Sequence, residues 1–261
     1  MSERSKTIAA PALTLAVVIP AFNEAATLRD IAVRALREVD RVIVVDDGSV
    51  DDTAAAVADL PVTLLSNSRN LGKAASLRRG MLCALENGAS AVVTLDADGQ
   101  HDPEDIPRLL AAHLHDPYAI IVGARLHDKR KIPHARYFAN RFASFLVAWA
   151  AGYPIADSQS GFRLYPASVL AALDIRNDTS QGFVFESAVL INAARAGYTS
   201  TPVKISAVYR TGARPSHFRP VMDIYLIGRM IWWSLLSRGF NIRGLIRSRR
   251  SPARGPHSHL A

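Results

Sequence analysis

The feature that most constrains the fold is a series of short apolar runs that each end in a turn or in acidic residues. The runs are rich in Val, Ile and Leu and do not alternate with polar residues, which is typical of strands buried on both faces in a parallel sheet. We therefore expect a buried sheet whose strands all end in polar loops. The runs are LTLAVVIP from Leu13, RVIVVDDGS from Arg41, PVTLL from Pro61, AVVTLDAD from Ala91 and AIIVGAR from Ala119.

Segments with helical spacing separate these runs and predict helices over residues 24–39, 51–60, 73–87 and 104–113. Ser49 and Asp52 have the spacing of a capping box, which would start the second of these helices. Strands and helices that alternate in this way predict the α/β class, with a Rossmann-like, doubly wound and mostly parallel sheet.

The pattern changes beyond Arg125, where helices are predicted over residues 135–151 and 184–196 and a strand over 201–210. Residues 221–236 are strongly apolar but are interrupted by Asp223, Gly228 and Arg229, which predicts an amphipathic helix. The division that follows is a catalytic domain over 13–220, a helical region over 221–247 and a disordered basic tail over 248–261.

Composition indicates the size of the hydrophobic core and the cellular compartment of the protein. The 261 residues are 49% hydrophobic, enough for one core with or without an appendage. Cys83 is the single cysteine, so no internal disulfide can form and a reducing compartment is expected. The first ten residues lack the apolar core of a secretory signal, and no apolar run reaches the roughly 20 residues of a spanning helix. A cytoplasmic location is the expectation.

The net charge of +8 is concentrated in the last fifth of the chain, where residues 203–261 hold eleven Lys and Arg and one acid, Asp223. This asymmetry predicts an anionic partner for the C-terminal part. Trp232 and Trp233 next to arginines suit a helix lying on an anionic membrane surface, and packing on the protein body or in a homodimer is the alternative. Nucleic acid is disfavoured because no base-reading motif accompanies the charge.

Ligands of open α/β sheets bind outside the carboxyl ends of the strands. Three acidic groups and Arg125 follow the predicted strands, so we expect them to converge in one crevice. The acidic groups are Asn23 with Glu24, Asp46 with Asp47, and Asp96 with Asp98.

The D-x-D spacing of Asp96 and Asp98 places two carboxylates on the same side of an extended segment, where they would repel each other. A hard divalent cation removes that cost, and Gln100 offers a third oxygen. The alternative is a polar loop that caps the helix at Glu104.

Lys73 follows Asn70, Leu71 and Gly72 at a predicted helix start, a position that favours an anion, although a turn with a surface lysine is the alternative. No G-x-G-x-x-G follows the first strand and no P-loop motif occurs, which disfavours a dinucleotide dehydrogenase and a P-loop NTPase. A receiver domain would be about half this length.

Six motifs in this order make the chain resemble a family 2 glycosyltransferase with a GT-A fold, most similar to the branch of dolichyl- and polyprenyl-phosphate sugar synthases. The resemblance covers roughly residues 13–220. The motifs are VVIPAFNE, VVDDGSVDDT, NLGKAASLRRG, LDADGQHDPEDI, GAR and SGFRLYP.

The resemblance implies a role for each matched position. The nucleotide pocket would be formed by Pro20, Phe22 and Glu24, with Asp47 and, behind it, Asp46 reaching base and ribose, and with Lys73 beside the nucleotide. Magnesium or manganese (Mg²⁺ or Mn²⁺) on the diphosphate would be held by Asp96, Asp98 and Gln100. Arg125 would meet phosphates or acceptor, Glu186 would face the sugar, and the acceptor side would include Ser160, Gly161, Phe162 and Arg163.

The implied reaction is an inverting transfer of a hexose from a nucleotide-diphosphate sugar, of the GDP-mannose or UDP-glucose type, to a lipid-linked acceptor. A phosphate acceptor is already anionic at neutral pH, since its second pKa is about 6. A hydroxyl acceptor needs a general base, and Asp157 is the candidate, with a turn-capping Asp as the alternative.

Five basic residues could clamp an acceptor phosphate: Arg163, Lys204, Arg210, Arg214 and Arg219. The polyprenyl-phosphate branch carries a Gly-x-Ser-Lys-like element in this loop, whereas here Ser216 is followed by His217. This departure leaves a hydroxyl on a lipid, pigment or glycan open as the acceptor. A non-catalytic nucleotide- or membrane-binding protein on the same fold is the remaining alternative.

Overall fold

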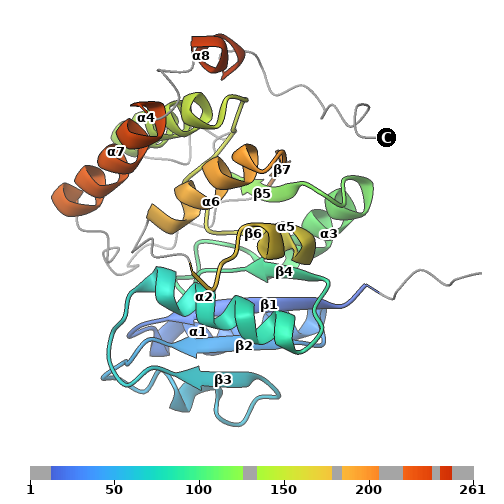
Figure 1. The fold of residues 1–261 in the computed structure, drawn as a ribbon. Coiled ribbons are helices and arrows are strands. Elements are labelled where there is room, and N and C mark those ends of the chain that lie inside the picture. Colours follow the sequence, from blue (N-terminus) through green and yellow to red (C-terminus); the bar gives the residue numbers. More distant parts are fainter. Residues whose placement is uncertain (1–12, 126–133, 178–183, 206–219, 237–241, 249–261) are drawn as a thin grey trace, which may run out of the picture.

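The computed structural model describes residues 13–125, 134–177, 184–205, 220–236 and 242–248 (Figure 1). These residues contain one seven-stranded sheet, in the order β3-β2-β1-β4-β6-β5-β7. β6 is antiparallel to both of its neighbours, and the other adjacent pairs are parallel. The strands are β1 (Leu15–Ala21), β2 (Val42–Asp46), β3 (Thr63–Ser66), β4 (Ala91–Thr94), β5 (Ile120–Ala124), β6 (Arg163–Pro166) and β7 (Ser200–Lys204).

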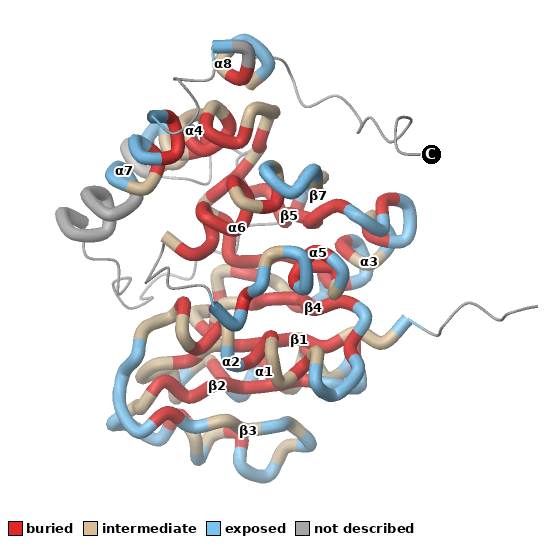
Figure 2. The backbone as a smooth tube through the Cα atoms, viewed as in Figure 1, coloured by how far each residue is buried: buried red, intermediate tan, exposed pale blue. Residues whose placement is uncertain are grey.

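Helices cover both faces of the sheet, which confirms the predicted doubly wound, mostly parallel architecture. α1 and α3 pack on the face that holds Val17 and Val44, whereas α2, α4, α5, α6 and α7 contribute to the core on the face of Val18 and Val45. Buried residues accordingly run along the central strands (Figure 2). The helices are α1 (Ala25–Glu38), α2 (Lys73–Glu86), α3 (Ile106–His115), α4 (His134–Ala151), α5 (Ala167–Ala172), α6 (Val184–Arg195), α7 (Pro220–Leu236) and α8 (Ile242–Ser248), with short 3₁₀ turns η1 (Ala55–Val57) and η2 (Pro103–Asp105).

The helix predicted over residues 51–60 is wrong. This segment forms turns and the three-residue η1, because its polar side chains accept hydrogen bonds from main-chain N–H groups, including that of Glu24 in the loop after β1. Asp51 accepts a hydrogen bond from the Thr53 N–H (3.1 Å), and the Ser49 hydroxyl accepts one from Asn23 instead of capping a helix. The other predicted helices are present, with their ends shifted by at most two residues.

α4, α7 and α8 gather at one end of the molecule, beyond the β5–β7 edge (Figure 1). Ile231 and Leu235 of α7 pack into the core, while Trp232 and Trp233 lie exposed. No helix in the part of the chain that the structure describes is long and apolar enough to cross a membrane.

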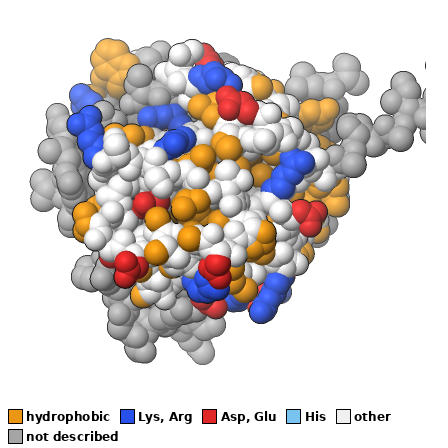
Figure 3. Space-filling view, turned by 90° about the horizontal axis from the view of Figure 1, so that it is seen from below, with side chains coloured by type: hydrophobic (Ala, Val, Ile, Leu, Met, Phe, Trp, Pro, Cys, Tyr) orange, Lys and Arg blue, Asp and Glu red, His pale blue; other side chains and the backbone are white. Residues whose placement is uncertain are grey.

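Charge is mixed on the face of the molecule seen from below (Figure 3), where Lys and Arg lie beside Asp and Glu and neither sign dominates. This distribution agrees with a near-neutral body and an excess of positive charge confined to the C-terminal part.

Candidate active site

The loops that follow β1 and β2 hold each other through hydrogen bonds between their motifs. Asn23 N–H donates to Ser49 Oγ (2.9 Å), and Val50 N–H donates back to Asn23 Oδ1 (2.9 Å). Asn23 has a left-handed backbone, φ 57°, which asparagine adopts more readily than most residues. The two motifs therefore form one connected rim at the carboxyl end of the sheet. Three predicted nucleotide-pocket residues lie half-buried along it: Pro20, Phe22 and Glu24.

Asp47 joins this rim to the start of α2. Its Oδ1 accepts a hydrogen bond from Leu71 N–H (2.9 Å), and its Oδ2 accepts one from Gly72 N–H (2.8 Å). Asp46 is also buried and accepts from Ser49 N–H at 3.0 Å. Both carboxylates thus order the loops around the predicted pocket, and their contact with base and ribose stays a prediction.

Lys73, the first residue of α2, lies between two carboxylates from distant parts of the chain. Its Nζ is 2.6 Å from Asp96 Oδ1, after β4, and 3.0 Å from Glu186 Oε1, on α6. Burial alone would lower the pKa of Lys73, but the two adjacent carboxylates outweigh burial and the pKa is raised. The structure therefore brings together three predicted site residues around one ammonium group.

The D-x-D-x-Q segment forms a turn after β4 in which partly exposed and buried residues alternate. Asp96, Asp98 and Gln100 are half-buried, whereas Ala97 and Gly99 between them are buried. Gln100 N–H donates to Asp98 Oδ1 (2.9 Å), which fixes the turn. Two carboxylates and an amide are thus partly accessible in this turn.

These residues fit a divalent cation that would take its remaining ligands from a diphosphate and water. Burial and the neighbouring Asp96 raise the pKa of Asp98. A divalent cation, in addition to Lys73, would therefore relieve the repulsion between these two carboxylates. Within the described residues no three His, Cys, Asp or Glu side chains form a complete metal cage. A magnesium ion needs only one or two carboxylates when phosphates and water supply its other ligands.

Gly161 lets the chain pass directly beside Asp96. A Cβ at residue 161 would lie 2.5 Å from Asp96 Oδ2, closer than real Cβ contacts allow. Thr94 Oγ donates to the Gly161 carbonyl at 2.6 Å and fixes this approach. Ser160, which the sequence assigns to the acceptor side, is fully buried, and its hydroxyl has no hydrogen-bond partner.

Arg163 does not suit the predicted phosphate clamp. Its guanidinium is fully buried and donates to the carbonyls of Ser160 (2.8 Å), Ser158 (2.7 Å) and Glu186 (2.6 Å). It therefore supports the turn before β6 and the start of α6, because its donors are directed to main-chain oxygens and not to the crevice.

Asp157 does not suit the predicted general base. Its side chain is 0% exposed, and its Oδ2 accepts from Arg125 N–H (3.2 Å) and Arg125 Nε (3.4 Å). Its Oδ1 accepts from Gln159 N–H at 3.3 Å. Asp157 instead orients Arg125, whose Nη2 donates to the Gln159 carbonyl at 3.3 Å.

His101 was not among the predicted site residues, although it directly follows Gln100. Its ring is buried against Phe162, and neither ring nitrogen has a hydrogen-bond partner. Nε2 lies 3.8 Å from Asp96 Oδ2. Burial, together with the positive charge of Arg125, lowers the pKa of His101 to about 3, so the ring is neutral. The signal in the sequence was a histidine directly after the D-x-D-x-Q pattern.

Of the remaining predicted acceptor residues, Lys204 is exposed at the end of β7. Four others lie outside the described residues: Arg210, Arg214, Ser216 and Arg219.

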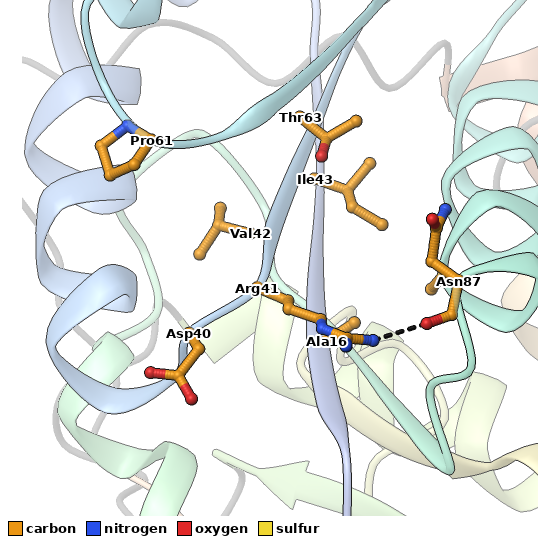
Figure 4. Close-up of a pocket in the computed structure, with 9 residues that line it drawn as sticks. Ala16, Asp40, Arg41, Val42, Ile43, Pro61, Thr63 and Asn87 are labelled. Atoms are coloured by element: carbon orange, nitrogen blue, oxygen red, sulfur yellow. Dashed lines mark hydrogen bonds between the residues drawn. The ribbon is translucent and has the colours of Figure 1, made fainter.

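A pocket of about 280 Å³ lies at the opposite, amino-terminal edge of the strands (Figure 4). Asp40 and Arg41 are the ionisable residues of its lining, and Arg41 Nη1 donates to the Asn87 carbonyl at 2.5 Å. The acidic loops lie at the other ends of β1 and β2, so this pocket is separate from the candidate site.

The sheet thus carries acidic loops at its carboxyl edge, and the D-x-D after β4 lies beside the lysine that begins α2. The family model described as glycosyl transferase family 2 matches residues 16–173. The chain belongs to this family and is a glycosyltransferase.

Two relatives fall in the branch that the sequence motifs indicated. UDP-N-acetylglucosamine–dolichyl-phosphate N-acetylglucosaminyltransferase of Methanococcus voltae is 30% identical over 60% of this chain and 71% of its own. Polyprenol monophosphomannose synthase of Mycolicibacterium smegmatis is 28% identical over 88% of this chain and 91% of its own.

Among solved structures, the fold is similar to glucosyl-3-phosphoglycerate synthase of Mycobacterium tuberculosis, crystallised with Mn²⁺, UDP-glucose and phosphoglyceric acid. The TM-score is 0.61 at 21% identity, over 87% of this chain and 80% of the other. This likeness confirms the GT-A fold.

Proposed function

We propose that this glycosyltransferase moves a hexose from a nucleotide-diphosphate sugar to a polyprenyl phosphate, with inversion at the anomeric carbon and with Mg²⁺ or Mn²⁺ on the diphosphate. The observation that carries the proposal is the pair Asp96 and Asp98 at the carboxyl edge of the sheet, next to Lys73. The names of the relatives, which act on dolichyl and polyprenyl phosphates, support the acceptor class.

The reaction follows from where charge moves. An acceptor phosphate oxygen forms the new bond to the anomeric carbon as the bond from that carbon to the diphosphate breaks, and the electron pair leaves with the diphosphate. When bound, the divalent ion neutralises part of this developing charge. In this proposal the ammonium of Lys73 adds to this effect, and Glu186, which pairs with Lys73, faces the sugar.

A phosphate acceptor also agrees with the burial of Asp157. A hydroxyl acceptor needs a carboxylate that can reach it, but both oxygens of Asp157 are engaged with Arg125 and Gln159 inside the protein. A phosphate monoester needs no such base at neutral pH.

We also propose that the chain lies on the inner face of the cell membrane, where a lipid-linked acceptor is accessible. The exposed aromatic side chains at the α4–α7–α8 end support this, and so does the basic charge after residue 203. In this proposal residues 13–220 are catalytic, 221–247 associate with the membrane or with a second copy of the chain, and 248–261 are a basic tail.

The test measures transfer from labelled UDP- and GDP-sugars to polyprenyl phosphate with Mn²⁺, for the wild type and for Asp96→Asn and Asp98→Asn. Each substitution should lower kcat by about 100-fold or more. Asp102→Asn is the matched control, since Asp102 lies in the same acidic stretch but pairs with Arg34 and caps η2. It should keep most activity.

Full activity in chelator would overturn the metal role, and transfer to a hydroxyl acceptor alone would overturn the acceptor. A protein that binds nucleotide but turns over no donor would favour the non-catalytic alternative.

A further inference from the structure

The ammonium of Lys73 already lies beside Asp96, where a divalent ion would bind. The ammonium bonds Asp96 Oδ1 at 2.6 Å, and that oxygen belongs to the first carboxylate of the D-x-D. Glu186 Oε1, at 3.0 Å, holds the ammonium from the other side. Both carboxylates are largely shielded from water, so this cation is strongly held.

The two oxygens of Asp96 have different neighbours. Oδ1 bonds the Lys73 ammonium, whereas Oδ2 lies 3.8 Å from Nε2 of the buried, neutral His101. Mg²⁺ binds a carboxylate oxygen at about 2.0–2.1 Å, so an ion on Oδ1 would compete with Lys73 for the same atom. An ion on Oδ2 would still lie close to the ammonium.

Two cations at this spacing also repel. Charges of +1 and +2 about 4 Å apart oppose each other by several kcal/mol even at an effective dielectric constant of about 20. The ammonium has to move when the ion binds, and an incoming diphosphate offers it a new anionic partner.

The start of α2 favours such a partner. Lysine at a helix N-terminus opposes the helix dipole, and the first turn of α2 has no acidic residue and no side-chain cap. The main-chain N–H groups there favour an anion, so a diphosphate near Lys73 would be stabilised by the helix as well.

We propose that Lys73 is an exchangeable occupant of the metal site: it holds Asp96 and Glu186 in the donor-free enzyme and transfers to the diphosphate when the ion binds. Metal ion and nucleoside diphosphate then bind cooperatively. The ion displaces Lys73 from Asp96, and the diphosphate becomes the new partner of Lys73. This inference rests on the proposed function, since it assumes a metal-bound diphosphate at this site.

The test is the affinity for Mn²⁺, measured by electron paramagnetic resonance with and without UDP or GDP, in the wild type and Lys73→Met. Without nucleotide, Lys73→Met should bind Mn²⁺ about tenfold more tightly than the wild type. With nucleotide the gain should shrink to less than about threefold, because Lys73 then supports the diphosphate.

Arg29→Met is the matched control. It removes one positive charge at the surface, where Arg29 pairs only with solvent-exposed partners such as Asp59, and should leave both Mn²⁺ affinities unchanged. Thermal unfolding verifies that each variant is folded, and Lys73→Gln replaces Lys73→Met if the latter is not.

Three outcomes are distinguishable. Equal Mn²⁺ affinity in wild type and variant overturns the exchange and leaves the proposed function intact. An equal gain with and without nucleotide also overturns it, since that is a general effect of charge. No Mn²⁺ binding by the wild type even with nucleotide would overturn the proposed function itself.

Discussion

Gly161 is the residue at which the local geometry of the site is most demanding. Gly161→Ala should displace the Asp96 carboxylate, because the new Cβ would lie 2.5 Å from Oδ2 and 2.9 Å from Oδ1. We expect kcat to fall by about 100-fold, as for other misplaced catalytic groups, together with weaker Mn²⁺ binding in the presence of nucleotide. Steady-state kinetics and electron paramagnetic resonance measure the two effects.

Gly228→Ala is the control for this substitution. Gly228 lies in α7 with nothing within 4 Å of a built Cβ, so alanine should leave kcat unchanged and stabilise the helix by up to about 1 kcal/mol. If Gly161→Ala were fully active, the position assigned to Asp96 would be incorrect.

Arg163 illustrates how a residue of a functional motif can act through the main chain. Arg163→Met would leave three buried carbonyls without their donor, so the free energy of unfolding should fall by roughly 3–5 kcal/mol. Urea denaturation measures the change. Arg176→Met removes an exposed ion pair with Glu86 and should cost less than about 1 kcal/mol. Similar losses in both variants would contradict the supporting role of Arg163.

At the scale of elements, the sequence identified the parts whose signal is local. The strands β1 and β2 appear as uninterrupted apolar runs, and α1 has a clear amphipathic repeat. Residues 51–60 look equally helical, but Thr53 and Ser49 receive hydrogen bonds from the loop after β1, and no local pattern reports such partners.

β6 was missed for a related reason. Its residues, Arg163–Pro166, are short and begin with an arginine, which argues against a buried strand. The arginine is accommodated because carbonyls from Ser158, Ser160 and Glu186 surround it, and these come together only in the folded chain.

In the site, too, the sequence identified residues through local motifs. Lys73 and Asp96 were assigned to the site from motifs and Glu186 from the family resemblance, and the structure brings the three together. The burial of Asp157 could not be predicted in this way, because nothing in its neighbours indicates an internal Arg125 partner. His101 was missed because its position depends on packing against Phe162.

α3 carries a pair of histidines that test burial within one element. Burial lowers the pKa of His113 below its usual value of 6.5, although Asp116 partly opposes this. As the pH falls below 6.5, the unfolded chain takes up this proton more readily than the folded one, so stability present above 6.5 is progressively lost.

His113→Gln should therefore make the free energy of unfolding depend less on pH between 7 and 5, by at most about 1.4 kcal/mol per pH unit. His115→Gln, two residues on and exposed, should leave the wild-type slope unchanged. Denaturant titrations at several pH values measure these slopes. A slope that is the same in the wild type and His113→Gln would show that His113 is not the group responsible.

At the scale of the whole molecule, the candidate site and the exposed aromatic side chains belong to different elements. The D-x-D lies at the carboxyl edge of the sheet, whereas α4, α7 and α8 lie together at one end of the molecule (Figure 1). In α4, Phe138 and Phe142 are 66% and 64% exposed, and in α7 Trp233 is 73% exposed. Because Ile231 and Leu235 hold the other side of α7 on the body, the helix can be anchored in the protein and still present its tryptophans outward.

This arrangement makes membrane association testable with the full chain. Trp232→Ala combined with Trp233→Ala should weaken binding to vesicles of phosphatidylcholine with phosphatidylglycerol by roughly tenfold or more, since interfacial tryptophans lose their contact with lipid. Co-sedimentation measures the binding. Transfer to a short, water-soluble polyprenyl phosphate should be unchanged, because neither tryptophan belongs to the candidate site.

Leu114→Ala combined with Tyr118→Ala is the matched control for this pair. Leu114 and Tyr118 are as exposed as the tryptophans, at 64% and 61%, but lie on and just after α3, away from the α4–α7–α8 end (Figure 1). Their removal should not change vesicle binding. If the tryptophan variant bound vesicles as well as the wild type but changed the sedimentation coefficient, this surface would be a contact between two copies of the chain. Lipid affinity would then have to come from the basic segment after residue 203.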